Sequence, residues 1–166
     1  MAIPKKIQNF LEKSKVKYET ITHKTVYTAY DLAQTLKTKL QEISKALIVK
    51  TEKGYTIVVL PASMMLDLNK LKKILKAKKI EIAKEGVMKK IFKIKPGTLM
   101  PFGALYKTPV LMEKSLAKAK NIITHAGSYT DSVKIKMADF LKLENPTQGI
   151  FGKKKEIKKK KATKKK

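Results

Sequence analysis

Few side chains in this sequence can carry acid–base chemistry near neutral pH, because it contains no cysteine and two histidines, His23 and His125. Histidine is the side chain whose ordinary pKa lies closest to neutral pH. His23 ends an alternating segment, and His125 comes just before the bend 126–128, so both can face a cleft. Each can equally be structural, and the two form a catalytic pair only if they meet in space.

Lys45 is another candidate, because it interrupts an apolar pattern. In the segment 44–51, strand alternation places Lys45, Leu47 and Val49 on one face. If that face is partly buried, the ammonium group must meet an anion or a carbonyl group in a cleft. The alternative is a lysine at the start of a strand whose stem carries the charge out to solvent.

The segment 94–110, IKPGTLMPFGALYKTPV, contains three prolines and two glycines, Gly97 and Gly103. Proline restricts the backbone, whereas glycine permits close approaches that other residues block. Such a loop is stiff and can present N–H and C=O groups to a ligand. It is predicted to hold a ribose, an ester carbonyl or a small side chain, with a structural crossover loop as the equal alternative.

Several other kinds of site are excluded or disfavoured. Ser128 and Asp131 follow His125, but the GxSxG motif of a nucleophile elbow is absent. The phosphate-binding GxGxxG and P-loop motifs and the HExxH zinc motif are absent too. Two histidines and no cysteine argue against a zinc site. We therefore expect no metal and no cofactor.

The charge is strongly positive, with 39 basic residues, all of them lysine, against 13 acidic ones. A polyanion is the partner that this charge favours, through salt-sensitive contacts with phosphates. Charge alone does not separate tRNA from rRNA, DNA or an acidic membrane, and many lysines can simply solvate the surface. Without arginine, bidentate guanidinium recognition of guanine or phosphate is not available.

Helical and strand periodicities alternate along the first 150 residues. They predict an α+β fold, with a mixed and largely antiparallel sheet flanked by helices, and one domain over 1–150. Residues 151–166, rich in lysine, are predicted to be a disordered tail. No signal peptide and no membrane-spanning run is recognisable, so a cytoplasmic protein is expected. The expected elements are helices at 4–13, 29–36, 67–77, 84–92 and 137–143, and strands at 18–23, 46–51, 55–60, 78–83, 109–112, 121–126 and 132–136.

Read in order, these segments resemble the YbaK/ProX-like aminoacyl-tRNA deacylases, which also occur as the insertion domain of bacterial prolyl-tRNA synthetases. The resemblance covers residues 3–145 and depends on the order and spacing of several weak motifs. These are His23 before a helix, SKALIVK with Lys45, the GxxxP pattern Gly97–Pro101, PVLM, and the AGS bend before SVKIKMADFLKL. Glu113 stands where the family leads us to expect Asp, and we interpret it as an exposed strand end.

The resemblance implies a curved central sheet and hydrolysis of the ester that joins a wrong amino acid to tRNA, without a metal and with help from the terminal ribose hydroxyl. Small amino acids such as alanine or cysteine on tRNA(Pro) are the implied substrates. Aminoacylated tRNA is then the partner, and an aminoacyl-tRNA synthetase is a second one by analogy. Lys45 is the implied catalytic residue. His125 stands at a position that differs among subfamilies, and we add it as a hypothesised catalytic residue that hydrogen-bonds to substrate or water. The implied substrate-binding residues are Gly97, Thr98, Leu99, Met100, Pro101, Phe102, Gly103, His23 and Ser128.

The main alternative is a basic tRNA- or rRNA-binding protein that keeps the fold but lacks the reaction, and a weaker one is a ribosome-associated protein. Replacement of Lys45 by alanine separates the deacylase from the RNA-binding protein. In a deacylase it should abolish hydrolysis yet leave salt-dependent RNA binding almost unchanged.

Overall fold

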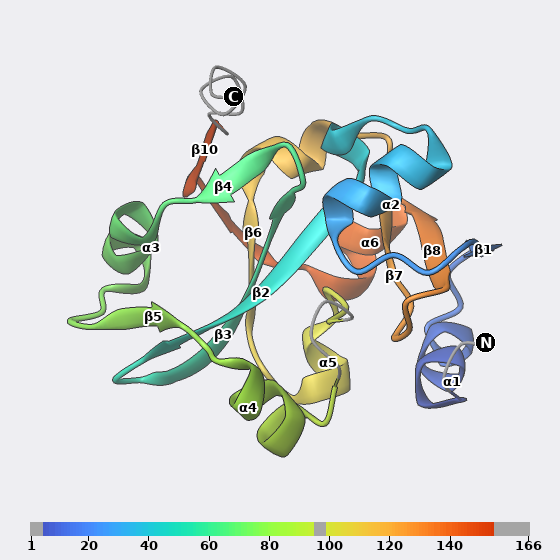
Figure 1. Cartoon of the computed structure of the whole chain (residues 1–166). Coiled ribbons are helices and arrows are strands. Elements are labelled where there is room, and N and C mark those ends of the chain that lie inside the picture. Colours follow the sequence, from blue (N-terminus) through green and yellow to red (C-terminus); the bar gives the residue numbers. More distant parts are fainter. Residues whose placement is uncertain (1–4, 95–98, 155–166) are drawn as a thin grey trace, which may run out of the picture.

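A computed structural model of the chain describes residues 5–94 and 99–154. Helices and strands alternate along the described chain (Figure 1). The helical elements are α1 (Lys5–Lys13), α2 (Ala29–Leu36), η1 (Leu40–Glu42), α3 (Leu68–Leu75), α4 (Glu85–Val87), η2 (Met88–Phe92), α5 (Gly103–Tyr106), η3 (Lys114–Lys118) and α6 (Met137–Glu144). The strands are β1 (Tyr18–Thr22), β2 (Ser44–Thr51), β3 (Gly54–Pro61), β4 (Met64–Leu66), β5 (Ile80–Ile82), β6 (Val110–Glu113), β7 (Asn121–His125), β8 (Asp131–Lys136), β9 (Thr147–Gly149) and β10 (Gly152–Lys154).

The largest sheet is mixed and has five strands in the order β5-β2-β3-β6-β9. Its first three strands are antiparallel, whereas β6 pairs in parallel with β3, and β9 pairs in parallel with β6. The β2–β3 hairpin turns at Gly54, whose φ of 124° is a conformation that glycine adopts readily. This hairpin carries Lys45 near its open end, paired with Leu60 of β3.

Two smaller antiparallel sheets complete the fold. One has the order β1-β8-β7, and it approaches the five-stranded sheet where Ile43 forms a bridge with Ile123. The other consists of β4 and β10, which run side by side in Figure 1. The predicted α+β class is confirmed, and its strands are divided among three sheets.

The core lies on both faces of β3, because alternate β3 side chains are buried in different clusters. Ile57 and Val59 pack in the cluster that contains Val133 of β8 and Phe140 of α6. Val58 and Leu60, on the opposite face, pack with Leu71 of α3 and with Phe151. Burial on two faces explains why β3 reads as a continuous apolar run.

Side chains cap the starts of two helices. The Thr28 hydroxyl accepts a bond from the N–H of Asp31 at the start of α2, and the Asp67 carboxylate does the same for α3. At the other ends, lysines occupy the left-handed conformation that usually favours glycine. Four of them, Lys37, Lys76, Lys93 and Lys107, are C-caps with φ between 53° and 55°.

The C-terminal boundary differs from the prediction. Residues 151–154 belong to the folded domain, because Phe151 is fully buried and Gly152–Lys154 form β10 against β4. The sequence predicted a tail from residue 151 because lysine dominates there, but the apolar side chain of Phe151 anchors this segment. Residues 155–166 lie outside the described residues.

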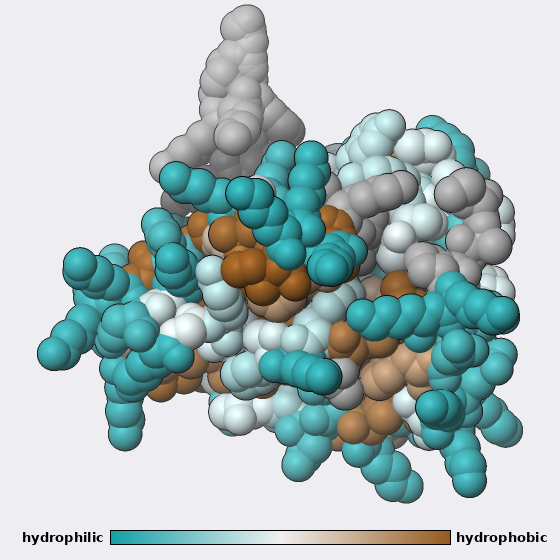
Figure 2. Space-filling model, turned by 90° about the horizontal axis from the view of Figure 1, so that it is seen from below, coloured by the Kyte–Doolittle hydropathy of each residue, from teal (hydrophilic) through white to brown (hydrophobic). Residues whose placement is uncertain are grey.

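The surface is dominated by hydrophilic side chains, which project around smaller hydrophobic patches on the face shown in Figure 2. Within the part of the chain that the structure describes, no helix is long and apolar enough to cross a membrane.

Candidate active site

Lys45 lies at the beginning of β2 and is half-buried. Its ammonium group donates a hydrogen bond of 2.8 Å to the backbone carbonyl of Met64 in β4. The side chain lies on the strand face of Leu47 and Val49, which pack in the cluster containing Leu71 and Phe151. The ammonium therefore meets a carbonyl group, as the interrupted pattern predicted.

His125 ends β7 and is 6% exposed. Burial, together with the charge of nearby His23, lowers the pKa of His125 to about 4, although a hydrogen bond with the Val26 backbone acts in the opposite direction. The hydrogen bond with Val26 raises the pKa because it stabilises the protonated ring, and the imidazole is therefore its donor. The ring is therefore neutral at pH 7.

The Nε2 atom of His125 is the one buried side-chain nitrogen or oxygen of the described residues without a hydrogen-bond partner. Since the bond to Val26 is made elsewhere on the ring, Nδ1 carries the proton and Nε2 keeps a free lone pair. A buried acceptor without a partner costs free energy, so a functional reason for it is expected.

Lys45 and His125 line the same cavity, which has a volume of about 280 Å³. This is near the lower end of the range of small-molecule sites, roughly 300–1,000 Å³. Ser44, Thr124 and Leu99 also line it. Its wall is mainly apolar, and its ionisable lining residues are Lys45, His125, Glu85 and Tyr27.

The cavity follows an open edge of β2. Strand β5 pairs with Val49–Thr51 and, in the described chain, does not extend along the residues of β2 before them. The Ile48 carbonyl points to this side, because it accepts from the N–H of Ala83. In an antiparallel pair, alternate residues point their backbone groups to alternate sides, so the N–H and C=O of Ala46 face the same edge. The cavity thus also has backbone groups along its wall.

Of the predicted substrate loop, Leu99 lines the cavity, whereas Met100, Pro101 and Phe102 are buried beside it. The N–H of Met100 donates to the hydroxyl of Tyr106 at 3.2 Å, and the ring of Phe102 packs on Phe10 and Phe140. These contacts fix the loop from inside the core. Gly97 and Thr98 lie outside the described residues.

Glu144 is a residue that the sequence analysis missed. At the end of α6, its carboxylate accepts a hydrogen bond from the N–H of Gly103, the first residue of α5. Burial raises the pKa of Glu144 to about 7, and the bond from Gly103 lowers it only in part. The N–H groups of Met100 and Gly103 are both occupied, so a donor role for this loop falls to its other N–H groups and stays a prediction.

His23 and Ser128 are absent from the described lining of the cavity. The Nε2 atom of His23 lies 2.9 Å from the Ser132 hydroxyl, and Nδ1 lies 2.8 Å from the Lys24 carbonyl. Ser128 bonds to the Asp131 carboxylate and accepts from the Asp131 N–H, so its hydroxyl holds the turn before β8. Their substrate-binding role stays a prediction.

The interpretation of Glu113 as an exposed strand end is wrong. Its side chain is 2% exposed, and its carboxylate accepts bonds from the N–H groups of Ser115, Phe151 and Gly152. Burial raises its pKa, but these three donors outweigh that effect, and the net pKa is lowered. The burial of Glu113 could not be predicted from its neighbours in the sequence, because two of its hydrogen-bond donors are 38 and 39 residues away.

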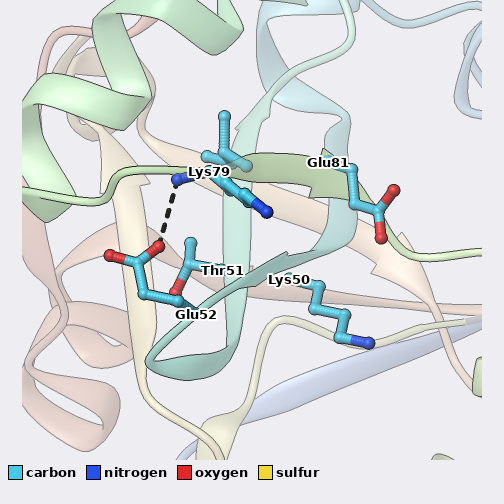
Figure 3. Close-up of a pocket in the computed structure, with 6 residues that line it drawn as sticks. Lys50, Thr51, Glu52, Lys79 and Glu81 are labelled. Atoms are coloured by element: carbon cyan, nitrogen blue, oxygen red, sulfur yellow. Dashed lines mark hydrogen bonds between the residues drawn. The ribbon is translucent and has the colours of Figure 1, made fainter.

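A second hollow, of about 320 Å³, lies at the far end of the β2–β3 hairpin, where it meets β5 (Figure 3). Glu52 accepts bonds from the backbone N–H groups of Lys78 and Lys79, which lower its pKa to about 2. This contact joins the hairpin turn to the segment before β5, and we interpret it as structural. In residues 5–94 and 99–154, no three acidic or histidine side chains gather as metal ligands would.

Comparison with known proteins gives the cavity its context. Residues 23–143 match the family of aminoacyl-tRNA editing domains. The prolyl-tRNA editing protein ProX of Acetoanaerobium sticklandii is 25% identical over 147 residues, covering 85% of this chain and 90% of ProX.

Solved structures share the fold at lower identity. The crystal structure of a hypothetical protein has a TM-score of 0.82 and 15% identity, covering 90% of this chain and 100% of the other. That of a candidate trans-editing enzyme for prolyl tRNA synthetase has a TM-score of 0.78 and 17% identity, covering 92% and 99%. The match over residues 23–143, which include both Lys45 and His125, shows that the chain belongs to the aminoacyl-tRNA editing domain family.

Proposed function

We propose that the protein is an aminoacyl-tRNA deacylase that removes a small, wrongly attached amino acid from tRNA in trans. The observation that carries the proposal is the unpartnered Nε2 atom of His125, on a residue that lines the same cavity as Lys45. Membership of the editing family supplies the reaction class. Alanine or cysteine on tRNA(Pro) is the leading substrate, and the related ProX is described as a prolyl-tRNA editing protein.

In the proposed reaction, water adds to the carbonyl carbon of the aminoacyl ester. The bond from this carbon to the ribose oxygen then breaks, and that oxygen takes up a proton, which gives free amino acid and intact tRNA. Neutral His125 accepts a hydrogen bond at Nε2 from the attacking water, or from the ribose hydroxyl beside the ester. Positioning of these groups in an apolar cavity supplies much of the catalysis for an activated ester, and no metal is required.

Lys45 supplies positive charge at the cavity wall. We assign it to the terminal phosphate of the tRNA, with the Met64 carbonyl holding the ammonium in place before the substrate binds. Selection is steric, because a cavity of about 280 Å³ admits a small side chain more easily than a large one. One methylene changes such discrimination by only about 1–3 kcal/mol, which is why a separate editing step is useful.

A non-catalytic RNA-binding protein is the second candidate, and the excess of 39 basic over 13 acidic residues favours it. The basic surface accounts for tRNA affinity in either case, but it gives no reason for a buried, unpartnered imidazole nitrogen. Aminoacylated tRNA is the partner under the first proposal, and a synthetase is a further proposed partner that would deliver it.

The test is hydrolysis of purified alanyl-, cysteinyl- and seryl-tRNA by the wild type, Lys45→Ala and Lys50→Ala. Lys50 is an exposed lysine of the same strand and provides a control with the same loss of charge. We expect one substrate to be hydrolysed rapidly, with a loss of about 10²-fold in kcat/KM for Lys45→Ala, because the substrate is then misplaced, and little change for Lys50→Ala. Binding without turnover of any substrate would support the RNA-binding candidate instead.

A further inference from the structure

Glu113 is the most enclosed carboxylate of the described chain that the proposed reaction does not use. It ends β6, and its two oxygens accept three backbone hydrogen bonds. The bonds from Phe151 and Gly152 are both 2.7 Å, and that from Ser115 is 3.1 Å. A buried carboxylate with this many short, charge-assisted bonds is a strong anchor for the backbone that it binds.

Two of the three donor residues, Ser115 and Gly152, lie against Met64. The Ser115 hydroxyl is 3.2 Å from the Met64 sulfur. Gly152 faces the same side chain so closely that an added Cβ would lie 2.9 Å from Met64 Cε and 3.2 Å from a Glu113 oxygen. Gly152–Lys154 then pair with Met64–Leu66, residue by residue.

Met64 is also the residue whose carbonyl accepts the hydrogen bond from Lys45. A lysine side chain has many rotamers, so a fixed partner is needed to hold its ammonium in one position. Functional groups are most effective when residues behind them restrict their geometry. Glu113, together with Ser115 and Gly152, packs against Met64 and so supports the carbonyl that receives the Lys45 ammonium.

We propose that Glu113 is a positioning residue for Lys45, acting through β10, Ser115 and Met64. By binding the Phe151 and Gly152 N–H groups, it holds β10 against β4, and this fixes the Met64 carbonyl that receives the ammonium. The C-terminal strand is therefore part of the active-site architecture. A catalytic role for Lys45 rests on the proposed function, whereas the placement of its ammonium by Glu113 can be measured separately.

Strand β10 lies near the C-terminal end of the chain, beyond the residues that match the family. The family match stops at residue 143, and β10 begins at Gly152. The lysine-rich residues 155–166 follow immediately. Glu113 therefore attaches β10, the strand that directly precedes these lysines, beside the strand whose Met64 carbonyl binds Lys45.

The first measurement is the acetylation rate of Lys45 by N-hydroxysuccinimidyl acetate, read by peptide mass spectrometry in the full-length protein. In Glu113→Gln, an amide group replaces one carboxylate oxygen and cannot accept from the same donors. Lys45 is expected to react about tenfold faster, which corresponds to ~1.4 kcal/mol of lost restraint. Glu19→Gln, with the same charge change at an exposed site of β1, should leave the rate unchanged.

A second variant approaches the cluster from the other side and keeps the carboxylate. Gly152→Ala places a methyl group against Met64, and Lys45 should again react faster. Circular dichroism shows which variants are folded, and the rate is compared among folded proteins only. An unchanged rate at Lys45 in the folded variants would overturn the proposal.

Kinetics then test whether the positioning matters for the reaction. Glu113→Gln should lower kcat/KM for aminoacylated tRNA, because Lys45 is assigned to its terminal phosphate, and it should cause no further loss in a Lys45→Ala background. Equal losses in both backgrounds would mean that Glu113 does not act through Lys45. If the wild type hydrolyses no substrate, the proposed function fails, whereas the acetylation result still decides the placement of Lys45.

Discussion

The carboxylate of Glu144 accepts a hydrogen bond of 3.1 Å from the backbone N–H of Gly103, which lies 41 positions earlier in the chain. The bond connects the end of α6 with the segment 99–103, whose first residue lines the cavity. The same carboxylate has a pKa raised to about 7 by burial. Its protonation state therefore changes within the range of pH in which the protein is assayed.

Glu144→Gln should stabilise the protein at alkaline pH. Because the pKa in the folded state is raised above the ordinary 4.5, the contribution of Glu144 to stability is complete below pH 4.5 and is lost as the pH rises through about 7. The amide stays neutral and still accepts from Gly103. At pH 8 we expect a gain of about 1 kcal/mol after solvent screening is considered, or about 2–4 °C in Tm.

Thermal unfolding at pH 4.5 and pH 8 measures this effect, with Glu19→Gln as the control for a lost surface charge. The wild type and Glu144→Gln should unfold at the same temperature at pH 4.5. A gain that is equal at both pH values would mean that Glu144 does not titrate as described.

Gly103→Ala should be strongly destabilising, because the added Cβ would collide with the backbone carbonyl of Thr108 and lie 2.9 Å from a Val110 methyl group. Overpacking of this kind costs about 1–3 kcal/mol. Gly86→Ala is the matched control, since nothing lies within 4 Å of its Cβ position. Urea unfolding of both variants decides the point, and equal stabilities would contradict the close packing at Gly103.

The pH dependence of hydrolysis should reveal a neutral His125. Its pKa is lowered to about 4, so the imidazole keeps its free lone pair as the pH falls through 6.5 and loses it near pH 4. After subtraction of spontaneous ester hydrolysis, kcat should be flat from about pH 5 to pH 7. His125→Asn should lower kcat by about 10²-fold or more and remove the acidic decline. A wild-type inflection at 6.5 would argue against this assignment.

Removal of residues 155–166 should weaken tRNA binding without affecting the reaction. This segment contains eight lysines and one acid, Glu156. We expect KM to rise and its salt dependence to become shallower, because fewer counterions are released, while kcat at saturating tRNA is retained. Complete loss of hydrolysis at saturating tRNA would favour the ribosome-associated alternative.

Local sequence signals predicted most of the fold, and the reasons can be seen in individual elements. Helices α2 and α3 lie within the ranges predicted for them, and their caps Thr28 and Asp67 bond to neighbours two or three residues away. The β2–β3 hairpin was predicted from apolar runs on either side of Gly54. The short strands β4, β9 and β10 were missed, because three residues are too few to show a periodicity.

The candidate site was predicted less completely. Lys45 was recognised because it interrupts an apolar face, and His125 because histidine is rare in this chain. Met64 contributes a carbonyl group, which any residue can supply, so its identity carries no signal. Glu113 and Glu144 form their bonds with donors tens of residues away, and only the folded arrangement brings these groups together.

The lysines that end the helices leave this fold capable of further stabilisation. A left-handed conformation costs a residue with a side chain about 1 kcal/mol relative to glycine, and part of this is offset by the greater freedom of glycine in the unfolded chain. Lys37, Lys76, Lys93 and Lys107 each bear this cost. Glycine at these four positions would give a more heat-resistant version of the domain while Lys45, His125 and their cavity stay untouched, a practical starting point for engineering a robust editing protein.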